Sequence, residues 1–174
     1  MYDRLVESRR LIAHGLPDER VGLSRRRRFQ PIAVNVDGVV AVTEFLTRAH
    51  GGAQWDTHLL ERRDGEWRLL GGGSGGGRDY AELLTAPVCA ELTDHHRADG
   101  GAGSSRSGRL RPGWVSSVHM SVCEHVAAVR VARRRTVPVP WHRRVSVVWD
   151  GRSVPRLELV GHNGDRLSEV RPDR

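Results

Sequence analysis

Four Asx-Gly dipeptides between apolar, β-branched runs constrain the fold of this chain more than any other feature. They are Asp37-Gly38, Asp64-Gly65, Asp150-Gly151 and Asn163-Gly164. Such dipeptides favour the tight turns that join antiparallel strands, because their central residues adopt positive φ readily. Parallel strands would instead need longer, usually helical, connections. The chain is therefore predicted to be mainly β, with antiparallel sheets that form a sandwich or two small packed β-units.

The runs beside these turns predict two β-meanders. The first would contain strands over residues 32–36, 39–46, 56–63 and 66–70. The second would contain strands over residues 145–149, 157–160 and 166–170, preceded by a run at residues 114–131 that alternates for much of its length.

Two short helices and two glycine-rich segments fill the remaining chain. Residues 2–14 carry a partial apolar stripe, and residues 79–92 have helical character. Residues 71–77 read GGGSGGG, which is typical of a linker. Residues 99–113 are rich in Gly, Ser and Arg, which is typical of a disordered segment or a long loop. We therefore expect a helix and meander over 1–70, a linker with a short helix over 71–113, and a second β segment over 114–174. The two β segments would be separate or would pack as one domain.

The composition is basic and lysine-free. All 28 basic residues are arginine, and the net charge is +7. The absence of lysine excludes mechanisms that need one, such as a Walker-type phosphate loop or a Schiff base. The codon usage of a GC-rich genome explains the arginines best, while the positive field favours anionic partners.

A row of polar side chains suggests a metal site. If residues 114–131 form a strand, then Ser117, His119, Ser121, Cys123 and His125 share one face, because side chains alternate along a strand. Thiolate and imidazole are zinc ligands. Residues two apart on a strand are only about 7 Å apart, so Cys123 and His125 could bind one ion together, with partners from elsewhere. The candidate zinc or polar site comprises His119, Cys123, His125, His142 and His162.

Two arginine groups form a second candidate site. They flank residues 136–141, so a turn there would bring them together, beside Trp141 as a stacking surface. The arginine groups would suit a phosphate ligand. The alternative is that these arginines are solvated at the surface and bind no ligand. The residues are Arg133, Arg134, Arg135, Arg143 and Arg144.

Residues 36–70 resemble one known family. With VDG followed by HLLERRDGEWRLL, this stretch is similar to the later strands of NTF2-like cone-shaped domains. The resemblance covers about a fifth of the chain. It implies a long hairpin with a turn before a tryptophan, and it keeps a small NTF2-like enzyme among the alternatives.

The predicted function is non-enzymatic binding or regulation, in which a protein partner is recognised through a sheet face or edge. The reason is that no convergent nucleophile, base and orienting group can be found in the sequence. One alternative is a nucleic-acid-binding accessory protein that uses the arginine groups. The other is a small metal-dependent or NTF2-like enzyme. A charged N-terminus and the lack of a long apolar run predict a cytoplasmic location without a membrane span.

Overall fold

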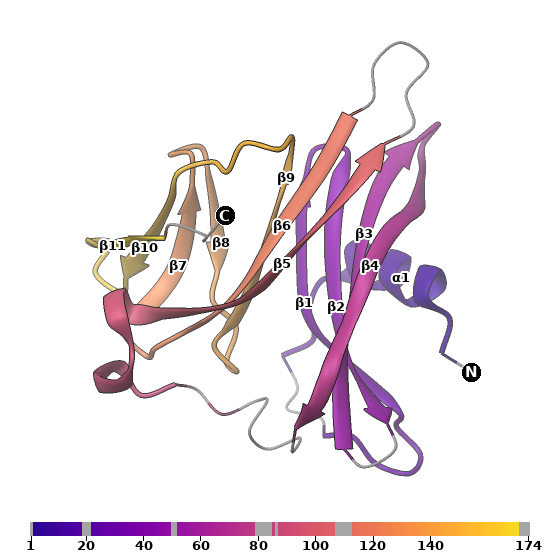
Figure 1. The fold of residues 1–174 in the computed structure, drawn as a ribbon, viewed down its shortest axis with the longest axis horizontal. Helices are drawn as coiled ribbons and strands as arrows, with labels where there is room; N and C mark the ends of the chain where they lie inside the picture. Colours follow the sequence, from indigo (N-terminus) through magenta and orange to yellow (C-terminus); the bar gives the residue numbers. More distant parts are fainter. Residues whose placement is uncertain are drawn as a thin grey trace.

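Three antiparallel sheets and one helix form the layers of the computed structural model, which describes residues 2–18, 22–49, 52–78, 85, 87–106 and 113–170. The strand orders are β11-β10-β7-β8, β5-β6-β9 and β1-β2-β3-β4. The sheet with β5, β6 and β9 lies between the other two, and helix α1 (Arg4–His14) covers the outer face of the β1–β4 sheet (Figure 1). The mainly β, antiparallel class is thus confirmed.

The first sheet follows the predicted meander. Its strands are β1 (Phe29–Asp37), β2 (Val40–Ala49), β3 (Gly52–Arg63) and β4 (Glu66–Arg78). Two of its turns lie at the predicted dipeptides, where Gly38 has φ 59°, Asp64 has φ 54° and Gly65 has φ 84°. Positive φ at these positions is what the Asx-Gly sequences supply.

The GGGSGGG stretch, expected to be a linker, instead forms the second half of β4. A Cβ on Gly72 would lie 1.9 Å from the carbonyl oxygen of Thr57 on β3. A Cβ on Gly75 would lie 3.3 Å from the ring of Trp55. Here glycine permits close approach of the backbone rather than flexibility.

The middle sheet corrects the expectation of an irregular segment at residues 99–113. It contains β5 (His96–Arg106), β6 (Gly113–Val122) and β9 (Arg144–Asp150), so most of that segment is strand, while residues 107–112 lie outside the described part of the chain. Gly103 explains why a Gly-rich sequence suits this strand. Its Cβ would come within 2.9 Å of the Trp114 ring on β6.

The expected central helix is not shown. Within the described residues α1 is the one α-helix, and residues 79–84 and 86 fall outside them. The described remainder of that region holds two short 3₁₀ turns, η1 (Cys89–Glu91) and η2 (Thr93–His95). None of the helices in the described ranges is long and apolar enough to cross a membrane.

The outer sheet shows where the second predicted meander fails. It contains β7 (Val126–Val131), β8 (Arg135–Pro138), β10 (Leu157–Gly161) and β11 (Arg166–Val170). The Asn163-Gly164 turn closes the β10–β11 hairpin as predicted, with Gly164 at φ 86°. Asp150-Gly151 closes no hairpin, because β9 belongs to the middle sheet and β10 to the outer one. The run at residues 114–131 is likewise split between β6 and β7.

Both faces of the middle sheet are buried, because it lies between the other two sheets. Towards the outer sheet it packs Val118, Met120, Val145 and Val147 against a cluster that includes Val129, Leu157 and Leu159. Towards the first sheet, Val115 and Val148 pack against Val40, Val42 and Leu59. In chain order, β6 of the middle sheet is followed by β7 of the outer sheet, and β9 of the middle sheet by β10 of the outer sheet.

Candidate metal centre

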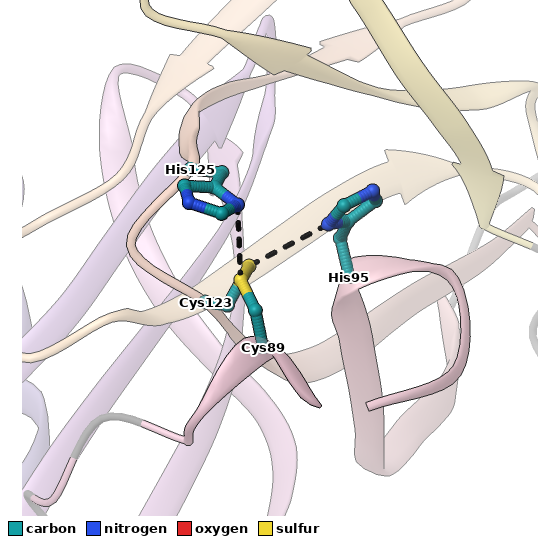
Figure 2. Close-up of side chains that lie close together, drawn as sticks. All are labelled: Cys89, His95, Cys123 and His125. Atoms are coloured by element: carbon teal, nitrogen blue, oxygen red, sulfur yellow. Dashed lines mark hydrogen bonds between the residues drawn. A yellow bond between two sulfur atoms is a disulfide. The ribbon is translucent and has the colours of Figure 1, made fainter. Parts of the chain in front are cut away.

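Two turns that are distant in sequence bring two cysteines and two histidines together. The η1 and η2 turns supply Cys89 and His95, and the β6–β7 turn supplies Cys123 and His125. One ligand atom from each side chain lies within 4.8 Å of the other three. Figure 2 shows the two imidazole rings on different sides of the sulfur pair, each aimed at it.

The contacts alternate between the turns. The Nδ1 atom of His125 lies 3.3 Å from Cys89 Sγ, and the Nδ1 atom of His95 lies 3.6 Å from Cys123 Sγ. Cys123 is fully buried, whereas His125 is exposed. The group therefore lies at the edge of the core, where small ions can reach it.

Backbone interactions hold both turns in place. The N–H of Cys123 donates to the carbonyl of His95 (3.2 Å), and the N–H of Val126 donates to the carbonyl of Cys123 (3.2 Å). The Arg143 guanidinium donates to the carbonyls of Cys123 and Val126. His95 itself has φ 66°, a left-handed conformation that costs about 1 kcal/mol or more in a residue with a side chain. The surrounding contacts keep the ring over the cysteines despite that cost.

Two of these distances are close to the edges of a tetrahedral zinc site. With Zn–S bonds of about 2.3 Å and Zn–N bonds of about 2.05 Å, the S···N edges of a tetrahedron are about 3.6 Å long. The two S···N contacts of 3.3 and 3.6 Å have that length. Two thiolates and two imidazoles are a common structural zinc set.

The cysteines are joined by a disulfide, with Cα atoms 5.1 Å apart. The bond uses both sulfurs, so this state and a zinc-thiolate state exclude each other. A zinc ion would require the sulfurs to separate to about 3.8 Å, the S···S edge of the same tetrahedron. The four side chains can thus hold a disulfide when the cysteines are oxidised, or offer two thiolates and two imidazoles to a metal ion when they are reduced.

The structure brings together only part of the predicted histidine set. Cys123 and His125 lie together, and their neighbours are Cys89 and His95 rather than His142 or His162. The reason is that β6 ends at Val122, so the chain turns before the polar row is complete. His162 Nε2 donates to the carbonyl of Glu124 (3.0 Å), and His142 is buried with its ring against Trp141.

His119 belongs to a separate buried network between the middle and first sheets. Its Nδ1 lies 2.7 Å from Glu44 Oε1, and Ser146 donates to Glu44 Oε2 (2.8 Å). Ser117 Oγ lies 3.2 Å from His119 Nε2, which gives the order serine, histidine, acid. All these side chains are buried, and the arrangement acts as a polar connection across two sheets. Burial raises the pKa of Glu44, but the charge and hydrogen bond of His119 and the charge of Arg144 outweigh it and lower the pKa to about 2.

Three of the five arginines of the predicted anion site make internal contacts. Arg135 donates to Asn35 and to backbone carbonyls, Arg143 holds the β6–β7 turn, and Arg144 pairs with Asp99 at 3.1 Å and lies over the Trp55 ring. Arg133 and Arg134 are exposed at the β7–β8 turn. Phosphate binding by the group remains a prediction.

Glu44, Cys89 and His95 were not among the predicted site residues. Cys89 offered one signal, since it is the one other cysteine in the sequence besides Cys123. His95 lies in a polar stretch that reads TDHH over residues 93–96, and nothing in this local sequence points to Cys123, 28 residues away. Their convergence depends on how η2 packs beside the β6–β7 turn.

Two buried histidines predict acid destabilisation. Burial lowers the pKa of His58 to about 4, and burial with the charge of Arg144 lowers that of His142 to about 4. Between about pH 6.5 and 4 the unfolded chain therefore binds protons that the folded protein does not. The free energy of unfolding is therefore highest above pH 6.5 and decreases as the pH falls, by up to about 1.4 kcal/mol per pH unit for each histidine.

Urea unfolding at several pH values measures this slope. His58→Asn should remove about half of the pH dependence of the free energy of unfolding between about pH 6.5 and 4. His162→Gln is the matched control, because His162 is exposed at the surface. A free energy of unfolding that does not change between pH 6.5 and 4.5 would contradict the assignment of neutral, buried rings.

Comparison with protein-family models, curated proteins and solved structures finds no match for this chain.

Proposed function

We propose that this protein binds one zinc ion through Cys89, His95, Cys123 and His125 when its cysteines are reduced, and releases the ion when they form the disulfide. It would thus act as a redox-responsive zinc-binding protein. The observation that supports this most is the meeting of four ligand atoms within 4.8 Å, from two turns tied by backbone hydrogen bonds.

The choice of zinc follows from the ligands. Sulfur and imidazole nitrogen in equal number suit a tetrahedral ion, whereas magnesium and calcium prefer oxygen. Arg143, which fastens the β6–β7 turn, and the η2 turn would hold the ligands in the same neighbourhood in both states. The two sulfurs need to move apart, and the ligand atoms, which now lie within 4.8 Å of one another, need to close to separations of about 3.8 Å or less.

The release step is an oxidation by a peroxide. The two zinc-bound thiolates lose two electrons and form the S–S bond. Hydrogen peroxide accepts those electrons with two protons and becomes two molecules of water, and Zn²⁺ leaves. A thiol reductant reverses the sulfur chemistry, after which zinc binds again.

Zinc content and thiol titration test the proposal. Untagged protein, reduced with a phosphine and equilibrated with zinc chloride, should hold about one zinc per chain after dialysis. One equivalent of peroxide should then release the zinc and remove two thiols together. His125→Gln and Cys89→Ser should each weaken zinc binding at least about tenfold, in line with the loss of a ligand.

His162→Gln is the matched control, because His162 contacts the same turn through Glu124 but lies outside the ligand group. It should bind zinc as the unmodified protein does. Less than about a tenth of an equivalent of zinc in the reduced protein would reject the proposal. So would zinc binding that His125→Gln leaves unchanged, and the disulfide would then be a purely structural crosslink.

A further inference from the structure

We propose that the cavity between β1, β8 and β9 binds an extended, acid-bearing segment of another protein, which would add to the structure as a strand. This site is separate from the zinc group and does not depend on it. The cavity has a volume of about 620 Å³ and is lined by residues 33–36 of β1, Arg135–Pro138 of β8 and residues 144–146 of β9. That volume is within the range of pockets that hold small molecules or short peptide segments.

Each of the three strands is the last in its own sheet. Among the described residues β1 pairs only with β2, β8 only with β7, and β9 only with β6. Each therefore has one edge without a partner strand, and all three line the same cavity. An unpaired edge offers backbone N–H and C=O groups to an incoming strand.

The orientation of the backbone on β9 is fixed by two contacts. The N–H of Val148 donates to Asn35 Oδ1 (3.0 Å), and its carbonyl accepts from Arg135 (2.7 Å). Both groups of Val148 thus point away from β6. Because this direction alternates along an antiparallel strand, the N–H and C=O of Ser146 point to the same open edge.

The same reasoning applies to β8. The N–H of Val139 donates to the carbonyl of Ala127 on β7 (3.0 Å), so the backbone N–H and C=O of Val139 and Val137 point towards β7. Thr136, between Val137 and Arg135, therefore turns its N–H and C=O outward. Thr136 is exposed and lines the cavity.

Arg135 limits the site at one end. Its guanidinium donates to Asn35 Oδ1 (2.7 Å) and to the carbonyl of Val36 on β1 (2.9 Å), and it also reaches Val148 on β9. It thus bridges β1, β8 and β9. The cavity extends from this bridge past Pro140 and Trp141.

Charge indicates the kind of segment. Two arginines, Arg135 and Arg144, and one acidic residue, Asp18, line the cavity, and the arginines pair with Asp37 and Asp99 respectively. Exposed Arg133 and Arg134 at the adjoining turn add positive charge without such a pairing in the described contacts. With a net charge of +7, a second copy of this chain would be repelled. An acidic segment from a different protein would be attracted.

Peptide binding tests the proposal. The probes are fluorescein-labelled, blocked heptapeptides in which Val alternates with Glu, Asp or Thr, measured by fluorescence anisotropy. We expect saturable binding that weakens as salt rises. N-methylation at alternate residues should lower affinity at least about tenfold by removing strand hydrogen bonds, and peptides with Arg in place of the acids should not bind.

Two protein variants form a matched pair. Thr136→Pro deletes the outward N–H and is compatible with an edge strand, so it should lower affinity about tenfold, while Thr136→Ser should not. The N-methylated peptides give the same information on the unmodified protein if Thr136→Pro does not fold. Absence of saturable binding, or binding that N-methylation leaves unchanged, would overturn the proposal. If the protein dimerises and the dimer no longer binds the peptide, the occupant is a second copy of the chain. If a single-stranded oligonucleotide displaces the peptide, and the Arg133→Gln/Arg134→Gln variant does not bind that oligonucleotide, the occupant is nucleic acid. Either result would also overturn the proposal.

Discussion

Replacing Glu44 by alanine is expected to lower the free energy of unfolding by about 3–5 kcal/mol. Glu44 is 2% exposed and its carboxylate contacts His119, Ser146 and Thr57 at 2.7, 2.8 and 3.2 Å. Truncation leaves three buried polar groups without their acceptor, on two sheets that these contacts connect. The loss should be measured by urea unfolding at neutral pH.

Glu66→Ala is the matched control, because Glu66 pairs with Arg9 at the surface, where 70% of its side chain is exposed. Exposed ion pairs of this kind contribute little, so the control should change stability by well under 1 kcal/mol. If Glu44→Ala also costs less than about 1 kcal/mol, then Glu44 does not connect the sheets in the way the contacts indicate.

Gly72→Ala is expected to cost about 3 kcal/mol or more, or to prevent folding at ordinary temperature. The new Cβ would lie 1.9 Å from the carbonyl oxygen of Thr57. This oxygen is a backbone atom in a paired strand, so it cannot move aside by a change of side-chain rotamer. Strand β4 would have to move away from β3 over several residues. Thermal unfolding of the variant, or its yield of folded protein, measures the effect.

Gly73→Ala provides the control one residue away. A Cβ there meets nothing within 4 Å, so the variant should be neutral or slightly more stable, because alanine restricts the unfolded chain. Equal effects of the two substitutions would mean that β4 does not lie against β3 at Gly72, and that the stretch is a loose segment.

Local turn chemistry made the hairpins predictable. Asp64-Gly65 forms the two-residue turn between β3 and β4, and Gly38 and Gly164 take positive φ in the β1–β2 and β10–β11 turns, because such short turns depend mainly on their own residues. Asp150-Gly151 shows the limit of this reasoning. Its dipeptide is equally favourable, but the chain leaves β9 for another sheet, and that choice depends on the burial of both faces of the middle layer.

The glycine-rich strands could not be read from composition. Gly72 and Gly103 lack side chains because a carbonyl and a tryptophan ring occupy the space, and this is a property of neighbouring strands. Only part of the Cys/His group could be predicted from the sequence, because the rest depends on tertiary packing. Cys123 and His125 are close in sequence and were predicted together, whereas Cys89 and His95 reach them only through tertiary packing.

X-ray absorption at the zinc edge of the reduced, zinc-loaded protein tests the central claim most directly. The account predicts one zinc with two sulfur ligands at about 2.3 Å and two nitrogen ligands at about 2.0–2.1 Å. The two sulfur ligands should be lost after peroxide treatment. A first shell of nitrogen and oxygen alone would contradict the account, because it would place the zinc away from Cys89 and Cys123.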